Sequence, residues 1–239
     1  LAGCGKMILG SDSHTRYGAL GTMAVGEGGP ELCKQLLKNT WDVPYPKVAL
    51  VYLTGAPRRG VGPHDVAIAL VKATFESGFV NNCVLEFAGP GITGLPIDFR
   101  NGIDVMTTET TCLSSIWETD GETKGFYEAH RRPSDFKELH PGEFAWYDRY
   151  IELDLSRVEP MIALPFHPSN AWTIREFLSN ARELLTGVEA DARKRYPKAR
   201  INLADKIHDG GVWADQGVVA GCAGGLFDNI TEAADILRG

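Results

Sequence analysis

A carboxylate, a hydroxyl and an imidazole stand next to one another near the beginning of the chain, at Asp12, Ser13 and His14, and the hydroxyl of Thr15 follows them. They come directly after Lys6–Gly10, a short apolar run that is typical of a buried strand. In open α/β sheets, ligands bind at the carboxyl ends of the strands. A carboxylate partner fixes the tautomer of an imidazole and supports its charged form, so this cluster has the groups that proton transfer requires.

The same residue types are also common in turns. Asp and Ser side chains often accept hydrogen bonds from backbone N–H groups just after a strand. The cluster at Asp12 and Ser13 therefore has two interpretations, a reactive site and an ordinary strand-end turn.

Strand and helix patterns alternate along the rest of the chain. Strands are expected at 6–10, 48–53, 84–87, 151–155 and 217–220, and helices at 30–38, 65–77, 171–185, 188–196 and 228–237. Such alternation predicts the α/β fold class with a largely parallel sheet. We expect the strands at 48–53 and 84–87 to share one sheet, with the helix at 65–77 packed on it.

A charged segment with several aromatic residues, 118–148, separates the first strands from the later elements. Its composition favours a surface excursion or a linker. We therefore expect a boundary near Tyr150, with a second α/β unit beginning at Ile151.

Composition excludes several classes of protein. Of the 239 residues, 44% are hydrophobic and 23% are charged, which is ordinary globular usage and not that of a disordered chain. The net charge of −7 leaves no basic surface overall, so we do not expect nucleic acid as a partner. No uncharged apolar run approaches the roughly 18 residues of a membrane span, and no signal peptide is recognisable.

The cysteines point to a reducing compartment. They form an odd-numbered, widely spaced set without any C-x-x-C pair: Cys4, Cys33, Cys83, Cys112 and Cys222. This spacing matches neither a disulfide framework nor a complete local metal or cluster site. We expect a cytoplasmic protein. Because the chain opens at Leu1 and runs straight into an apolar stretch, we also expect it to be a fragment.

Several motifs, taken in order, resemble the aconitase family, which includes aconitases, homoaconitases and the large subunit of isopropylmalate dehydratase. They are GSDSHT (10–15), PKV and LTG (46–55), EFAGPGI (86–92), NGID (101–104), YDRYIELDLSRVEP (147–160), PFHP (165–168) and GC (221–222). The resemblance covers most of the chain and implies three-layer αβα domains with largely parallel sheets. It implies that residues 1–46 end a first domain, 47–150 form a second, and 151–239 begin a third.

The resemblance also assigns roles to residues. Asp12 matches an aspartate that pairs with a histidine outside this chain, and Ser13 matches a serine that contacts the substrate. His14 matches a histidine paired with a later acidic residue, whose place, normally Glu, is taken here by Asp104. Cys222 matches the first of three cysteines that bind a [4Fe–4S] cluster. We therefore expect His14 and Asp104 to approach each other directly or through one water.

Four positions depart from the family pattern. Asp104 is one methylene shorter than the usual Glu, and Arg100 takes the place of an asparagine. Cys222 is followed by Ala223 and Gly224 instead of Thr-Asn, so the polar neighbours of this cluster ligand are missing. We expect Cys222 to be a free thiol at a strand end or helix start, facing a cleft and not the core.

Taken together, the resemblance predicts a fragment of a hydro-lyase that reversibly hydrates and dehydrates a hydroxy di- or tricarboxylic acid on a [4Fe–4S] cluster. The intact protein would carry the cluster and the remaining domains. These residues alone would bind no cluster and be inactive, since Cys222 is the only cysteine at a cluster-ligand position. The alternative is a non-catalytic aconitase-like module with an RNA-binding or regulatory role.

Other polar residues have simpler interpretations. The segment 107–112 either lines the cleft after Asp104 or is an ordinary β-rich stretch. His64 and His167 stand beside prolines and are expected to be surface loop histidines. The arginines of 131–132 and 193–195 are expected to lie on solvated faces.

Overall fold

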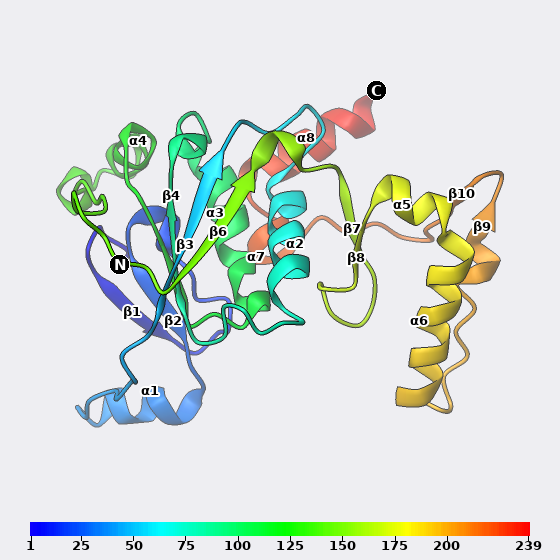
Figure 1. The fold of residues 1–239 in the computed structure, drawn as a ribbon, viewed down its shortest axis with the longest axis horizontal. Helices are drawn as coiled ribbons and strands as arrows, with labels where there is room; N and C mark the ends of the chain where they lie inside the picture. Colours follow the sequence, from blue (N-terminus) through cyan, green and yellow to red (C-terminus); the bar gives the residue numbers. More distant parts are fainter.

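A four-stranded parallel sheet lies at the centre of the computed structural model, which describes all residues from Leu1 to Gly239 (Figure 1). Its strands are β3 (Val48–Thr54), β4 (Val84–Ala88), β5 (Ser114–Trp117) and β6 (Arg149–Asp154), in the spatial order β5-β4-β3-β6. Neighbouring strands all run parallel. The predicted α/β class is thereby confirmed, and the sheet with its helices is consistent with an aconitase-like αβα domain.

The core forms where β3 and β4 meet helix α2 (Pro63–Thr74). Alternate residues of β3, Ala49, Val51 and Leu53, are fully buried, as expected when one face of a strand packs against a covering layer. Val66 and Leu70 of α2 pack into the same cluster. The expected strand–helix–strand unit is therefore confirmed, and α2 begins slightly earlier than the sequence pattern indicates.

Strand β6 corrects the expected boundary near Tyr150. It pairs with β3 in parallel register from Ala49–Arg149 to Thr54–Asp154. The alternating pattern that begins at Ile151 thus marks an edge strand of the same sheet and not the start of a separate unit. The assignment of residues 1–46, 47–150 and 151–239 to three domains stays a prediction, with the sheet of the middle part extending to Asp154.

A smaller parallel pair precedes this sheet. Strand β1 (Met7–Gly10), which the sequence predicts, pairs with β2 (Met23–Gly26), which it does not. Parallel neighbours need a crossover connection. Here residues 11–22, including the Asp12–Thr15 cluster, form it. The Ser114 hydroxyl of β5 donates to the Ala24 carbonyl of β2 at 2.7 Å and links the two sheets.

The segment 118–148 is more ordered than a linker. It contains helix α4 (Gly121–Ala129), whose Tyr127 is fully buried. The Tyr127 hydroxyl donates to the Leu20 carbonyl at 2.7 Å, and Cys4 N–H donates to the Asp135 carbonyl at 2.8 Å. The segment therefore packs against the N-terminal part of the chain.

The remaining elements lie around and beyond the sheet (Figure 1). They are α1 (Gly29–Leu36), α3 (Ile97–Met106), β7 (Met161–Ala163), β8 (Ala171–Thr173), α5 (Ile174–Ser179), α6 (Ala181–Arg195), β9 (Ile207–His208), β10 (Gly211–Val212), α7 (Gly221–Gly224) and α8 (Phe227–Arg238). Helix α6 with strands β9 and β10 forms the end of the molecule farthest from β1 and β2 in this view. No helix is both long and apolar enough to span a bilayer.

Two expected elements differ from the structure. The helix predicted from residue 171 begins as strand β8, and the chain breaks at Asn180 before α6 runs without interruption through Gly187. The strand expected at 217–220 does not form, because Val218 and Val219 are largely exposed and no neighbouring strand pairs with them.

Arg100 is a fully buried cross-link. Its guanidinium donates twice to Asp120, at 2.9 and 2.6 Å, and also to the carbonyls of Leu95 and Ile92. Asp120 is the N-cap of α4, so this one side chain joins α3, the loop after β4 and the start of α4. Bidentate pairs of this kind fix geometry as well as charge.

We expect Arg100→Leu to lower the free energy of unfolding by about 3 kcal/mol or more, because buried acceptors lose their donors. Arg175→Leu is the matched control. Arg175 also pairs with a carboxylate, Glu159 at 2.8 Å, but its side chain is 74% exposed. Loss of an exposed pair costs about 1 kcal/mol at most. Urea unfolding of both variants measures the difference, and equal losses would contradict a structural role for Arg100.

Candidate functional site

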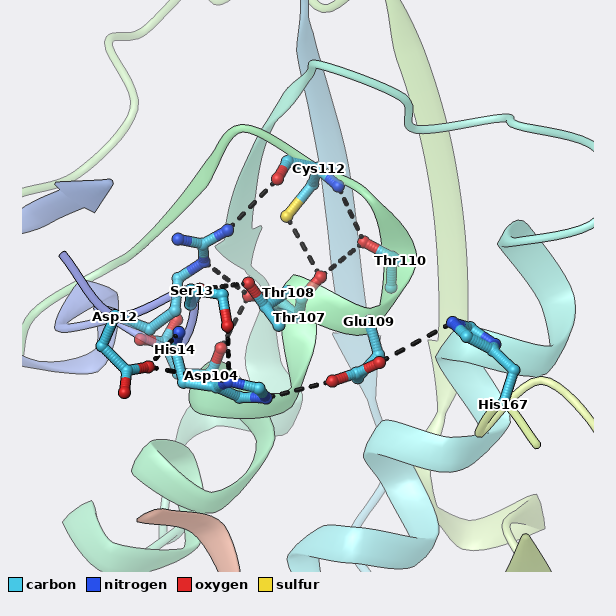
Figure 2. A network of polar contacts seen from close by, with 11 residues as sticks. Asp12, Ser13, His14, Asp104, Thr107, Thr108, Glu109, Thr110, Cys112 and His167 are labelled. Atoms are coloured by element: carbon cyan, nitrogen blue, oxygen red, sulfur yellow. Dashed lines mark hydrogen bonds and ion pairs between the residues drawn. The ribbon is translucent and has the colours of Figure 1, made fainter. Parts of the chain in front are cut away.

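A carboxylate, an imidazole and a hydroxyl form one connected chain of polar contacts (Figure 2). His14 Nε2 lies 3.0 Å from Oε1 of Glu109, and His14 Nδ1 lies 3.1 Å from the Ser13 hydroxyl. The side chains of His14 and Glu109 are 27% and 23% exposed. The pair is therefore shielded on most sides but open to a small solute.

The contacts fix which nitrogen of His14 carries the proton. A carboxylate accepts hydrogen bonds, so Nε2 of His14 donates to Glu109, and in the neutral ring Nδ1 is left as an acceptor for the Ser13 hydroxyl. When the ring gains a second proton, Nδ1–H donates to Ser13 instead. The arrangement can thus receive or deliver a proton at Ser13 Oγ while Glu109 balances the charge of the imidazolium.

Asp12 shapes the turn that presents these groups. Its carboxylate is largely exposed and accepts the backbone N–H of His14 at 2.7 Å. The Asp12 carbonyl accepts both the N–H and the hydroxyl of Thr15, at 3.0 and 2.6 Å. The two interpretations of the cluster are therefore compatible, because a strand-end turn holds Ser13 and His14 in place.

Asp104 lies elsewhere than the sequence predicts. It is 1% exposed, and its carboxylate accepts the Gly18 N–H at 2.7 Å and the Trp117 indole N–H at 2.8 Å. The expected contact with His14 is not found, because His14 bonds to Glu109 instead. Asp104 is enclosed within α3 and is already occupied by two donors, whereas Glu109 stands on the 3-10 helix Thr107–Thr110 and reaches the imidazole.

The backbone of Gly18 lies very close to the buried carboxylate of Asp104. A Cβ atom there would lie 2.7 Å from a carboxylate oxygen of Asp104 and 2.6 Å from the Ser115 carbonyl. Both distances are too short for a real side chain. Glycine at this position therefore lets the segment after His14 settle onto Asp104.

A buried arginine joins the two halves of the site. Arg16 is almost fully buried, and its guanidinium donates to Thr107 Oγ1 at 3.3 Å and to the Cys112 carbonyl at 3.1 Å. Thr107 and Cys112 lie on either side of Glu109 in the sequence. Arg16 therefore ties the Asp12–Thr15 turn to the segment that carries Glu109. The sequence pattern gives no sign of this role beyond the position of an arginine directly after Thr15.

The segment 107–112 lines the site and is not β-rich. It forms a 3-10 helix followed by Thr111 in the left-handed region, at φ 65°. The Thr108 hydroxyl donates to the Ser13 carbonyl, a second link between the two segments. Cys112 is buried, and burial raises the pKa of its thiol, which disfavours the thiolate. Glu109 is the residue that sequence reasoning missed; the available signal was a full-length acidic side chain just beyond Asp104.

The two proline-flanked histidines differ in position. His64 lies in the first turn of α2, and burial lowers the pKa of its imidazole. His167 lies in the loop between β7 and β8, as expected, but it faces the site. Its Nε2 is 3.7 Å from Oε2 of Glu109.

Cys222 is exposed and stands at the start of α7, as expected, although no strand precedes it. Cys4, Cys83 and Cys112 are buried, and Cys33 is exposed on α1. No three His, Cys, Asp or Glu side chains are grouped so that they could hold a metal ion. A cubane is held by thiolates that converge on it, so these residues offer at most one ligand, Cys222, and do not fit a whole cluster by themselves.

Burial raises the pKa of Asp104, and the hydrogen bonds from its neighbours and the charge of Arg16 offset this only in part. A carboxyl with a raised pKa makes the folded state lose stability as pH rises from the unfolded-state pKa of about 4 towards the folded-state value. Asp104→Asn removes this contribution. The stability advantage of the wild type over this variant should therefore be largest below pH 4 and shrink as pH rises.

Urea unfolding at a series of pH values measures this trend. Asp154 provides a control of opposite sign, because hydrogen bonds from Ser156 lower the pKa of its carboxyl. The advantage of the wild type over Asp154→Asn should be complete above the unfolded-state pKa and be lost as pH falls through the folded-state value. Parallel pH trends for the two variants would contradict the assignment of Asp104 as a destabilised buried carboxylate.

Comparison with known proteins places this chain in a family. The family model described as "Aconitase family (aconitate hydratase)" matches residues 1–239. Similar proteins include the 2,3-dimethylmalate dehydratase large subunit of Eubacterium barkeri, 27% identical over 100% of this chain and 49% of the relative. The 3-isopropylmalate dehydratase large subunit of Campylobacter hominis is 28% identical over 98% of this chain and 49% of the relative. That of Picrophilus torridus is 29% identical over 98% of this chain and 58% of the relative. The chain spans about half the length of these curated relatives, and it belongs to the aconitase family.

Proposed function

We propose that this chain carries part of the active site of a hydro-lyase that reversibly removes water from a hydroxy di- or tricarboxylic acid. Membership of the aconitase family and relatives named as dehydratases of substituted malates support the reaction class. The observation that carries the proposal is the Ser13–His14–Glu109 chain of contacts, set on the turn that also holds Asp12.

Dehydration needs a group that moves a proton and a group that steadies the charge this creates. His14 can hold or release a proton at Nδ1, next to the hydroxyl of Ser13. Glu109 accepts from Nε2 and stabilises the charged ring. Ser13, at the exposed tip of the turn, is the group we propose to contact the substrate. Asp12 holds the backbone of the turn, and Asp104 holds the segment after it at Gly18.

The catalytic centre would be completed by parts that lie outside these residues. We propose that Cys222 supplies one thiolate ligand to a [4Fe–4S] cluster whose other ligands come from elsewhere in the protein. When bound, such a cluster supplies a Lewis acid for the leaving hydroxyl. All three relatives described above are named as large subunits, so a further domain or chain is the proposed partner. Three buried free thiols favour a reducing, cytoplasmic location.

The alternative is a non-catalytic aconitase-like module that binds RNA or regulates. Ala223 and Gly224, which follow Cys222 in place of polar residues, favour this non-catalytic alternative. The net charge of −7 weighs against RNA as a partner, because phosphate contacts need clustered Lys and Arg. A non-catalytic module needs no chain of proton-transferring groups such as Ser13, His14 and Glu109, and we therefore favour the enzyme.

Glu109→Gln in the complete protein tests the proposal. Without the negative charge, the imidazolium of His14 loses its support, and kcat should fall about 100-fold or more, within the usual range for general acid–base catalysis. Glu183→Gln, on the exposed face of α6, is the matched control and should leave kcat unchanged. Turnover of substituted malates and tricarboxylates is followed by the absorbance of the unsaturated product. Undiminished kcat in Glu109→Gln would remove Glu109 from the mechanism, and absence of turnover in the wild type would contradict the hydro-lyase.

Anaerobic reconstitution with iron and sulfide tests the cluster. The 239-residue chain should take up no stoichiometric cluster, whereas the complete protein should. In the complete protein, Cys222→Ser should lower the iron content and visible absorbance, and Cys33→Ser, which changes another exposed cysteine, should not. Stoichiometric uptake by the 239 residues alone would mean that a different set of ligands exists.

A further inference from the structure

A second histidine approaches Glu109 from the side opposite His14 (Figure 2). His14 Nε2 lies 3.0 Å from Oε1 of Glu109, and His167 Nε2 lies 3.7 Å from Oε2. Each oxygen of one carboxylate therefore faces an imidazole nitrogen. The two histidines come from segments far apart in the sequence, so the fold and not a local motif brings them to Glu109.

The neighbours of His167 determine which nitrogen carries its proton. The backbone N–H of Ser169 donates to Nδ1 at 3.1 Å, and the Ser169 hydroxyl lies 3.0 Å from the same atom. A backbone N–H can only donate, so Nδ1 holds a lone pair and the proton of the neutral ring is on Nε2. This Nε2–H makes no hydrogen bond in the structure. It faces Glu109 at a distance that a small rotation of either side chain would close.

The position of the His167 ring is set by α2 and not by the site. The ring stacks on Phe75, just after α2, with centroids 3.7 Å apart and planes inclined by 24°. Asp65 at the start of α2 accepts the Met161 N–H of β7, and Lys72 lies over the Trp172 ring of β8 at 4.6 Å. The β7–β8 hairpin is therefore attached along α2, and the stacked ring of His167 lies beside a carboxylate that has several rotatable bonds.

We propose that His167 is a positioning residue that holds the Glu109 carboxylate so that Oε1 accepts from His14. Without the second N–H, the partly exposed carboxylate would rotate towards solvent for part of the time. His14 would then lose the partner that selects its Nε2–H tautomer. The consequence for catalysis rests on the proposed function, but the effect on His14 exists without turnover.

The first test observes His14 directly, in two-bond ¹H–¹⁵N spectra of the complete protein labelled at histidine. The wild type should show the Nε2–H tautomer of His14. His167→Phe keeps a ring to stack on Phe75 but removes the N–H, and it should produce a mixture of tautomers. His167→Gln, whose amide N–H can reach Glu109, should restore the wild-type pattern. His140→Phe is the matched control, because His140 also lies near a glutamate, Glu118 at 3.9 Å, but away from the site.

The second test asks whether His167 acts through Glu109. In the Glu109→Gln background, His167→Phe should cause no further change in the His14 spectrum or in kcat. In the wild-type background, His167→Phe should lower kcat about tenfold and leave KM nearly unchanged. An effect of this size is usual for residues that orient a catalytic group without touching the substrate. His167→Asn, whose amide is too short to reach Glu109, provides a second variant with a polar side chain if His167→Phe folds poorly.

The outcomes separate this inference from the proposed function. An unchanged His14 spectrum in His167→Phe and His167→Asn, or the same change in the Glu109→Gln background, would overturn the positioning role. A changed spectrum in a protein that turns over no hydroxy acid would support the positioning role and contradict the hydro-lyase.

Discussion

The site depends on two opposite charges that are buried together without forming an ion pair. The guanidinium of Arg16 donates to carbonyl and hydroxyl oxygens, and the carboxylate of Asp104 accepts from Gly18 and Trp117. A buried charge is costly unless hydrogen bonds satisfy it, so each fixes the backbone around it. Together they hold the segment from Thr15 to Gly18 against α3 and the turn that follows it. The spacing of His14 and Glu109 follows from that attachment.

This constraint explains why the two carboxylates have different tasks. Asp104 is short, enclosed and surrounded by donors, and its raised pKa records the cost of its burial. Glu109 is longer and partly exposed, so it can face both the imidazole and solvent. A group that stabilises a charge appearing on an imidazole must reach that ring, and Glu109 reaches Nε2 of His14. A group that fixes a loop is better placed out of reach of water, where its hydrogen bonds are strongest.

Sequence reasoning succeeded where local pattern determines structure and failed where contacts are long-range. The strands around Val51 and Phe87 and the helix between them follow from apolar periodicity, and His14 follows from its place after a strand. The pairing of β6 with β3 could not be foreseen, because an alternating edge strand looks the same in any sheet. The partner of His14 was misplaced for a related reason. The position of Asp104 in a motif indicated it as the partner of His14. Asp104 is buried away from the imidazole, whereas the longer side chain of Glu109 reaches it.

The relation between Asp104 and Glu109 limits what a motif match can establish. A substitution of Glu by Asp at one position shortens the side chain by a methylene, and a contact across two segments cannot stretch to compensate in a close-packed interior. Another carboxylate within reach of the same imidazole can take over the interaction if the backbone near it is held firmly. Arg16 and Thr108 supply that attachment here, since both bond across the gap between the two segments. The contact between His14 and a carboxylate therefore depends on the geometry around His14 and not on the residue at one motif position.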